Sequence, residues 1–516
     1  MTTEQMQNDS GGYSGNGFIM QPGRNCWRIE TAGRASCLVD GEAYFTAAKQ
    51  ALLKARHSIQ ILGWNFAEQA RLQPGQSDPH WPDEIGALLE TLADEREGLS
   101  VHVLAWDKTP ALALGRRELP GAQAADMNSG RVRYRLDAAH PALASHHQKV
   151  LVVDDAVAFC GGFDLAANRW DTRDHLPEEP RRRMPTGQPY EAHHDVMLAV
   201  DGDAARALGD LARERWRLAT GEPLAPTPPN PDAWPEDTIP DFHDVPVGIV
   251  RTAPAWRDRP EIREAEALFL DSIAAARDSI YVESQYFAAP RIADAMAARL
   301  KEADGPDIVV VNPKRAPSAT EQVAMDTART RMLHDLQKAD KHGRFRLFAA
   351  VNGDEEIVVH SKVMVVDDAL LRIGSANMNN RSMGVDTECD LAIEAARAPD
   401  ASRVRGQIVD VRNDLLAEHL GVSADVFSAT LTEEGSLVSA IDALNGTSRR
   451  RLAHFDEPRP NRLVPVEHNA LLDPYKPLGR WWKPSRPGIF LASAAIASLA
   501  GLALIARIRK SSRYRT

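Results

Sequence analysis

A long internal repeat constrains this chain more than any other feature of its sequence. The stretch HHQKVLVVDDAVAFCGGFDLAANRW, which begins at His146, returns as VHSKVMVVDDALLRIGSANMNNRSM from Val359, in register at an offset of 213 residues. Residues 44–66 and 265–287 also correspond, because each has the pattern of an amphipathic helix, a short turn and an apolar strand. This period is far longer than that of a solenoid, so we interpret the repeat as a duplicated domain.

Each copy also has a second apolar strand before the motif strand, at residues 100–106 in the first and 307–313 in the second. Strands that alternate with helices are typical of α/β domains, in which helices cover a sheet. The sequence therefore predicts an α/β fold with two pseudo-symmetric α/β/α lobes. Matched polar motifs in the two copies indicate one active site between the lobes.

The C-terminal part carries the longest apolar run of the chain. Residues 488–506 (GIFLASAAIASLAGLALIA) contain no charge, and 19 residues are just enough to span a bilayer core of about 30 Å. Tryptophans and a lysine precede the run and basic residues follow it, as expected at the two membrane interfaces. We expect a single-pass transmembrane helix, and a small-residue stripe on it (Ser493, Ala497, Gly501) suits a homodimer contact.

Composition and termini complete the domain organisation. Gly221–Pro246 holds eight prolines and predicts an extended linker, and the first 22 residues lack the apolar region of a secretory signal. We therefore expect the catalytic body to be cytoplasmic. The expected boundaries are 1–22 for a flexible N-terminus, 23–220 for the N-terminal lobe, 221–246 for the linker, 247–430 for the C-terminal lobe, 431–486 for a C-terminal extension, 487–507 for the transmembrane helix and 508–516 for a basic tail.

Both copies of the repeat contain the pattern H-x-K-x-x-x-x-D. On a strand, residues two apart point to the same face, so each His and Lys project together, whereas the Asp points elsewhere. We therefore expect the Asp to brace the end of the strand through a salt bridge or backbone hydrogen bonds. The residues are His147, Lys149 and Asp154 in the first copy and His360, Lys362 and Asp367 in the second.

Two imidazoles and two ammonium groups that converge suit a phosphodiester. The lysines would hold the non-bridging oxygens, while one His attacks phosphorus and the other protonates the leaving oxygen. A metal site is the alternative interpretation, because imidazoles are supplied by His146, His147, His193 and His194. A Lys two residues after His, however, would repel a cation. We expect no metal, and the absence of a Gly-rich nucleotide loop predicts no nucleotide cofactor.

The paired motifs resemble those of the phospholipase D superfamily over residues 25–395. GGFDLAANRWD (161–171), GSANMNNRSM (374–383) and YVESQYF (281–287) are more similar to true phospholipases D than to the one-motif nucleases. The resemblance implies a phosphohistidine intermediate that water or an alcohol then cleaves, with no metal obligatory for the chemistry. It also implies that His147 is the nucleophile and that His360 is first the general acid and then the general base, although the pseudo-symmetry makes this assignment reversible.

The resemblance extends to residues around the two pairs. It implies an acid behind each histidine, and Asp195 and Glu388 stand in suitable register, with Asp390 as a rival for Glu388. Asp164 occupies the first-lobe position that matches Asn377, where an anion must be paired to lie near phosphate. The residues implied to bind the phosphate are Lys149, Lys362, Asn377, Gly162 and Ser375.

The function that we expect is a phospholipase D that hydrolyses a glycerophospholipid, such as phosphatidylcholine or phosphatidylethanolamine, and also transfers phosphatidyl groups to alcohols. The alternatives are a cardiolipin synthase-like phosphatidyltransferase, a phosphodiesterase or nuclease on the same fold, and, without catalysis, a tail-anchored interaction protein. The formal net charge of −11 includes nine cations and no acid from Lys476 onward, which leaves −20 for the rest. We therefore expect a phospholipid substrate and no nucleic-acid partner.

Overall fold

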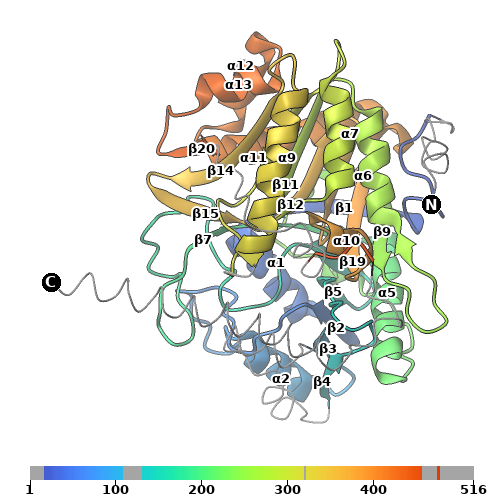
Figure 1. The fold of residues 1–516 in the computed structure, drawn as a ribbon. Coiled ribbons are helices and arrows are strands. Elements are labelled where there is room, and N and C mark those ends of the chain that lie inside the picture. Colours follow the sequence, from blue (N-terminus) through green and yellow to red (C-terminus); the bar gives the residue numbers. More distant parts are fainter. Residues whose placement is uncertain (1–16, 108–130, 319–320, 456–472, 477–516) are drawn as a thin grey trace, which may run out of the picture.

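The computed structural model describes residues 17–107, 131–318, 321–455 and 473–476 of the 516-residue chain (Figure 1). The predicted transmembrane helix at 487–507 and the basic tail lie outside these residues. Within the described ranges, none of the helices combines the length and the apolar character that crossing a membrane requires.

The first half builds one sheet with helices on both faces. Its elements are β1 (Arg28–Val39), α1 (Asp40–Lys54), β2 (Ser58–Gly63), α2 (Ile85–Glu95), β3 (Ser100–Trp106), β4 (Val132–Asp137), β5 (Val150–Val153), β6 (Val157–Gly161), β7 (Ala192–His194), β8 (Val196–Asp201) and α5 (Gly202–Thr220).

The second half repeats this plan and adds a helical hairpin and a last strand. Its elements are β9 (Phe242–Ala253), β10 (Ile262–Arg263), α6 (Glu264–Ala275), β11 (Ser279–Ser284), β12 (Phe287–Ala288), α7 (Pro290–Leu300), β13 (Asp307–Val311), α9 (Thr327–Ala339), β14 (Phe345–Asn352), β15 (Glu355–Val359), β16 (Lys362–Val366), β17 (Leu370–Gly374), β18 (Met378–Asn379), α10 (Asn380–Gly384), β19 (Glu388–Glu394), α11 (Ala401–Leu420), α12 (Ala424–Glu434), α13 (Leu437–Leu444) and β20 (Arg450–His454). Short helical turns lie at Pro231–Ala233, Gln322–Asp326 and Ala395–Arg397.

Strand pairing shows the duplication directly. The hydrogen-bonded order is β4-β3-β2-β5-β6-β8-β1 in the first lobe and β14-β13-β11-β16-β17-β19-β9 in the second. In both lobes the first three strands are parallel and the others are antiparallel. The lobes join where β1 pairs antiparallel with β9, so the two sheets form one continuous ladder around a pseudo-twofold relation.

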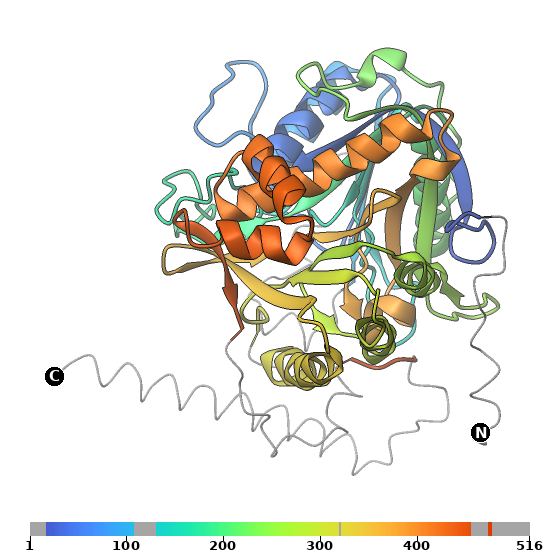
Figure 2. The same ribbon diagram turned by 90° about the horizontal axis from the view of Figure 1, so that it is seen from above.

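Apolar cores hold the layers together. Helices α1 and α2 pack on the outer face of the first sheet, and α6, α7 and α9 pack on the outer face of the second. Helices α5 and α11 lie on the inner faces, in one core that both lobes share (Figure 2). Because this shared core crosses the lobe boundary, the two lobes form one body around the motif strands.

Three segments differ from the boundaries expected from sequence. Ile19 and Met20 are buried, and their amides donate to the Glu394 carboxylate, so the chain is already anchored before residue 22. Strand β9 begins at Phe242, inside the predicted linker, because its first residues pair with β1. Strand β20 pairs with β14, so part of the predicted C-terminal extension completes the second sheet.

Candidate active site

The two motif strands begin at the lobe interface, and backbone bonds between the lobes fix their positions. The amide of His147 donates to the Thr387 carbonyl oxygen at 3.0 Å, and the amide of His360 donates to that of His194 at 2.8 Å. β15, which leads into His360, also runs parallel to β7 of the first lobe. The segment before each motif histidine therefore lies beside the segment before an acid of the opposite lobe.

This exchange gives each histidine a carboxylate from the other lobe. Nδ1 of His147 lies 2.8 Å from Oε2 of Glu388, and Nδ1 of His360 lies 2.7 Å from Oδ2 of Asp195. The rival Asp390 is not at the site, because it accepts a hydrogen bond of 2.7 Å from Nη2 of the buried Arg372. A carboxylate on Nδ1 leaves Nε2 of each imidazole for chemistry.

The two lysines are both buried, but their surroundings differ. Nζ of Lys149 lies 3.2 Å from Oδ2 of Asp164, which also accepts the amides of Trp64 and Asn65. At the matching position the second lobe has the neutral Asn377, and within the described part of the chain the hydrogen bonds of Lys362 Nζ go to His360, with Nζ 3.1 Å from Nδ1. Asp164 is thus paired with a cation, as an anion near phosphate must be. The positive charge of Lys362 has no matching carboxylate, because Asn377 is neutral.

Electrostatics follow from this burial. Desolvation lowers the pKa of His147 and of His360 well below the ordinary value, and the neighbouring lysine ammonium groups lower both further. Desolvation also lowers the pKa of Lys362 to about 7, against the attraction of Asp195. Neutral imidazoles are available as nucleophile and base near neutral pH.

The residues implied to bind phosphate fall into two groups. Asn377 is buried, and its side-chain oxygen has no hydrogen-bond partner within the described part of the chain. Ser375 instead donates its hydroxyl to Oε2 of Glu388 at 2.5 Å. A Cβ on Gly162 would lie 1.9 Å from Oδ1 of Asp195, so Gly162 makes room for that acid. Ser375 and Gly162 therefore support the crossed carboxylates.

The motif aspartates lie at the far ends of the motif strands. The Asp154 carboxylate accepts the amides of Arg56, His57 and Ser58, with distances from 2.6 to 2.7 Å. Asp367 accepts the amides of Arg277, Asp278 and Ser279 in the same way, and both aspartates have φ of 52°. Each aspartate ties the turn after its strand to the start of a neighbouring strand, β2 or β11.

One further group was not recognised in the sequence. The positive charge of Arg169 lowers the pKa of His360 and of Lys362, so its guanidinium is a third cation near the second pair. Arg169 stands in the GGFDLAANRWD stretch but has no counterpart in the repeat, where Ser382 occupies the matching position. The departure from the repeat was the signal that could have indicated it.

A buried network lies beside the segment between β7 and β8 that carries Asp195. Four donors lie within 4.8 Å of one another, and such a set could hold a metal ion. Two further carboxylates hold the outer nitrogens of its histidines: Nδ1 of His175 is 3.0 Å from Asp171, and Nε2 of His194 is 3.0 Å from Glu283. We assign no chemical step to this network. Its four donors are Asp40, His175, His194 and Glu418.

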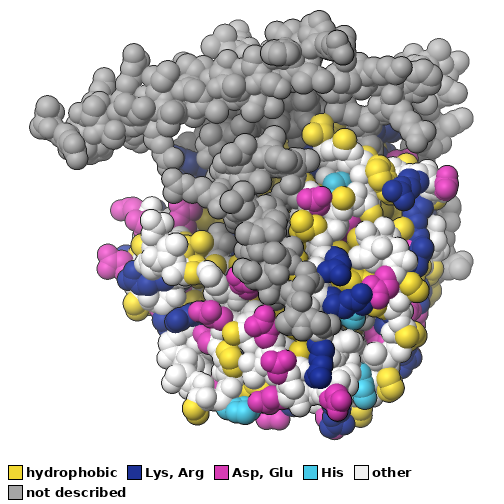
Figure 3. Space-filling model, turned by 90° about the horizontal axis from the view of Figure 1, so that it is seen from below, with side chains coloured by type: hydrophobic (Ala, Val, Ile, Leu, Met, Phe, Trp, Pro, Cys, Tyr) yellow, Lys and Arg dark blue, Asp and Glu magenta, His cyan; other side chains and the backbone are white. Residues whose placement is uncertain are grey.

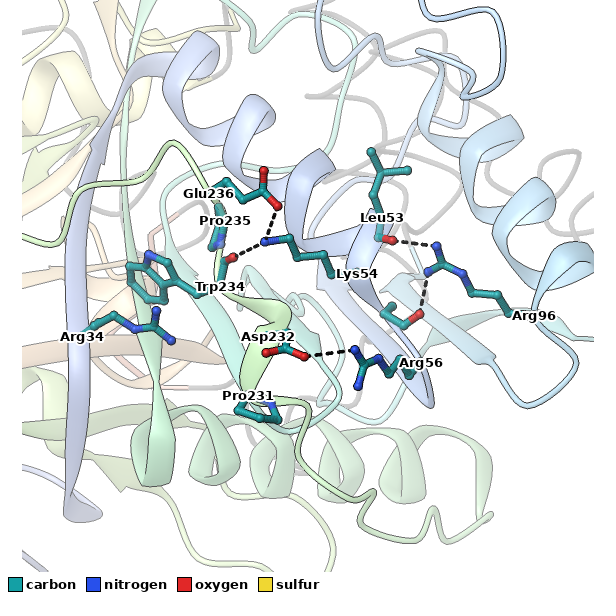
Figure 4. A pocket seen from close by; sticks show the side chains of 11 residues that line it. Arg34, Leu53, Lys54, Arg56, Arg96, Pro231, Asp232, Trp234, Pro235 and Glu236 are labelled. Carbon is teal, nitrogen blue, oxygen red and sulfur yellow. Dashed lines mark hydrogen bonds and ion pairs between the residues drawn. The ribbon is translucent and has the colours of Figure 1, made fainter.

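A pocket of about 920 Å³ lies apart from the two histidine–lysine pairs, between the end of α1 and residues 231–236 (Figure 4). Two cations that line it are already in ion pairs: Lys54 pairs with Glu236 at 3.1 Å, and Arg56 pairs with Asp232 at 3.0 Å. None of the residues that line it carries the repeated motif. The candidate active site is therefore the cluster between the lobes in which each motif histidine contacts a carboxylate of the opposite lobe.

Comparison with known proteins identifies a family model and several relatives that match this chain. A family model described as Phospholipase D matches residues 51–227 and 325–476. The chain is 23% identical to phospholipase D alpha 1 of Vigna unguiculata and 24% identical to phospholipase D alpha 3 of Arabidopsis thaliana. Each alignment covers 74% of this chain and 64% of the relative, so the chain spans less than two thirds of those proteins. A solved structure, phosphatidylserine synthase of Haemophilus influenzae Rd KW20, matches with a TM-score of 0.46 at 14% identity, covering 75% of this chain and 86% of that one.

Proposed function

Since the chain belongs to the phospholipase D family, we propose that it is a phospholipase D that cleaves glycerophospholipids to phosphatidic acid and free headgroup. One observation carries this proposal: two histidine–lysine pairs meet at the lobe interface, and each histidine contacts a buried carboxylate of the other lobe. Two histidines supply the two roles that cleavage through a covalent intermediate requires. Phosphatidylcholine and phosphatidylethanolamine are the proposed substrates.

The proposed reaction has two steps. Nε2 of His147 attacks phosphorus, and the P–O bond to the headgroup breaks as His360, which is protonated at Nε2 in the substrate complex, donates that proton to the leaving oxygen. His360 then takes a proton from water, whose oxygen attacks phosphorus and releases His147. Lys149, Lys362 and the Asn377 amide hold the non-bridging oxygens in both steps. An alcohol in place of water would give a phosphatidyl alcohol.

The crossed carboxylates support this scheme because they act on the nitrogen opposite the reacting one. Glu388 and Asp195 hold the Nδ1 protons, so Nε2 is the reacting nitrogen of each ring: in the first step it carries the free lone pair on His147 and the transferred proton on His360. The carboxylates also stabilise the positive charge that forms on each ring. Lys149 is paired with Asp164, whereas the second lobe has the neutral Asn377 at the matching position. The two halves of the active site are therefore unequal, which suits two different histidine roles.

A lipid substrate is favoured over a nucleic acid. The described residues of one face carry basic and acidic side chains interspersed with one another (Figure 3), whereas a nucleic-acid partner requires clustered cations. We also propose that residues 487–507 anchor the chain in a membrane with the catalytic body in the cytoplasm, and that Ser493, Ala497 and Gly501 allow a homodimer. The uncharged run from 488 to 506 supports the anchor.

The decisive experiment uses mixed phospholipid vesicles that contain ethanol. The intact protein should release headgroup and form phosphatidylethanol, and the amount from each lipid would rank the headgroups. The His147→Ala variant should form neither product, because it lacks the attacking nitrogen. Cleavage of a generic phosphodiester without any lipid turnover would contradict the lipid assignment, while the phosphodiesterase chemistry would stand.

A further inference from the structure

A short C-terminal segment returns to the body beside the active site. We call residues 473–476 the C-terminal strap; Figure 1 shows it in red beside α10. The buried Asp473 carboxylate accepts the amide of Arg381 at 2.8 Å and that of Asn380 at 3.1 Å. The Tyr475 hydroxyl donates to Glu266 at 3.1 Å. The strap is therefore fixed at one place on the second lobe.

The Tyr475 ring strengthens this attachment. The guanidinium carbon of Arg263 lies 4.4 Å from the ring centroid, and Nη2 of Arg263 donates to the Tyr475 carbonyl oxygen at 2.9 Å. Arg291 also donates to the Tyr475 hydroxyl. Contacts from α6, α7 and α10 thus hold four residues that have no strand or helix of their own.

The attachment point lies on the rim of the candidate active site. Arg381, whose amide binds Asp473, pairs through its guanidinium with Asp386 at 2.6 Å. Asp386 accepts the amide of Ser145 at 2.8 Å, two residues before His147. Only two side chains thus separate the strap from the segment that carries the proposed nucleophile.

The rim at this point has the character of a lipid-facing surface. Arg381 donates to the Leu143 carbonyl oxygen at 2.7 Å, and Leu143 is a large apolar residue with 41% of its surface exposed. Lys476 is exposed, and the Arg291 side chain is 53% exposed. An exposed leucine and exposed cations suit the interface of a phospholipid bilayer, where apolar groups insert and cations meet phosphates.

Chain length then decides which side of the body faces the membrane. Gly488, where the uncharged apolar run begins, follows Lys476 by twelve residues, which span at most about 40 Å. A compact body of this size is about 60 Å across. A chain fixed at the strap is too short to pass around the body to its opposite side. The bilayer must therefore lie on the strap's side.

From these observations we propose that the C-terminal strap orients the active site toward the bilayer, with Leu143, Arg291 and Lys476 as the surface that meets phospholipid. The proposal rests on the proposed lipid hydrolysis and on the anchor at 487–507. Neither Asp473 nor Tyr475 belongs to the chemistry. They are positioning residues that act on access to a membrane substrate.

The first test compares two substrates with the full chain reconstituted in phosphatidylcholine vesicles. The double variant Asp473→Ala/Tyr475→Ala should lower headgroup release from the vesicle lipid about tenfold. The active site then no longer faces the bilayer, so the effective concentration of lipid at the site falls. Turnover of dibutyroyl phosphatidylcholine, which is monomeric in water, should stay within about twofold. Equal losses on both substrates, or no loss on either, would overturn the proposal.

A second variant leaves every contact of the strap intact. An insertion of twenty Gly and Ser residues after Gly479 lengthens only the connection to the apolar run, and it should also lower vesicle turnover alone. Asp442→Ala is the matched control, because Asp442 makes one surface ion pair, with Arg346, and should change neither rate. Vesicle turnover that is unchanged by the insertion would contradict the length argument.

A third readout requires no catalysis and separates this proposal from the proposed function. Brominated phosphatidylcholine quenches tryptophan that contacts lipid, so Leu143→Trp should add quenched fluorescence relative to the parent chain. The added quenching should disappear when Leu143→Trp is combined with the strap variant. Unquenched fluorescence with an intact strap would overturn the proposal, even in a preparation that hydrolyses lipid. Full quenching without lipid turnover would refute only the proposed function.

Discussion

Nδ1 of His147 lies 2.8 Å from Oε2 of Glu388, although the two residues are 241 positions apart and belong to different lobes. The same relation, reversed, joins His360 of the second lobe to Asp195 of the first. Each half of the site is therefore incomplete without the other lobe. This crossing explains why a duplicated domain, rather than a single copy, forms the site within one chain.

Substitution of Glu388 should mainly lower turnover, whereas substitution of Asp390 should mainly lower stability. Glu388→Gln should lower kcat by about a hundredfold or more with little change in Tm, because it disturbs only the orientation and charge of His147. Asp390→Asn should instead destabilise the fold by about 3–5 kcal/mol, because it leaves the buried Arg372 guanidinium uncompensated. Steady-state kinetics and thermal melts of both variants check this. The opposite pattern would exchange the roles of the two acids.

Either lysine should be indispensable for turnover. Lys149→Ala or Lys362→Ala should lower kcat/KM by at least about a hundredfold, because each removes a preorganised charge from the phosphate. Lys149→Ala should also lower Tm more than Lys362→Ala does, since it leaves the buried Asp164 without its ion pair. Rates near those of the intact protein for either variant would contradict a single site that uses both lobes.

The pH dependence should report the ammonium group of Lys362. Because its pKa in the free protein is lowered to about 7, the charged fraction falls as pH rises through 7, and kcat/KM should decline above that pH. Bound phosphodiester stabilises the ammonium, so kcat should decline only at higher pH. Lys362→Arg should remove the decline of kcat/KM near pH 7, because a guanidinium remains charged. A decline at the same pH in this variant would assign it to another group.

The motif aspartates should matter for stability rather than chemistry. Asp154→Ala or Asp367→Ala removes the acceptor of three backbone amides and should lower the free energy of unfolding by about 3 kcal/mol. Asp368→Ala is the control, because its partly exposed pair with Arg405 should contribute no more than about 1 kcal/mol. Denaturant melts measure these differences. Loss of kcat without loss of stability would move the aspartates into the catalytic machinery.

Much of the architecture follows from local patterns. The register between the copies at His146 and Val359 predicted two equivalent lobes, and the strand orders of the lobes are the same. The alternation along each motif strand predicted that His and Lys share a face and that Asp does not. The boundaries were less predictable: β20 joins its sheet through pairing with β14, a contact that no local pattern around residue 450 encodes.

The sequence by itself determined the duplicated α/β fold and the two histidine–lysine pairs, because periodicity and residue spacing act over a few positions. The pair of acids behind the histidines was implied by the family resemblance. Only the tertiary structure decided which acid serves which histidine, that Glu388 rather than Asp390 does so, and that Ser375 and Gly162 support these acids. The pairing of each acid with its histidine depends on which strands are neighbours across the junction between β1 and β9. The two histidine–carboxylate pairs join residues 241 and 165 positions apart, which the shared core of the two lobes brings within hydrogen-bond distance.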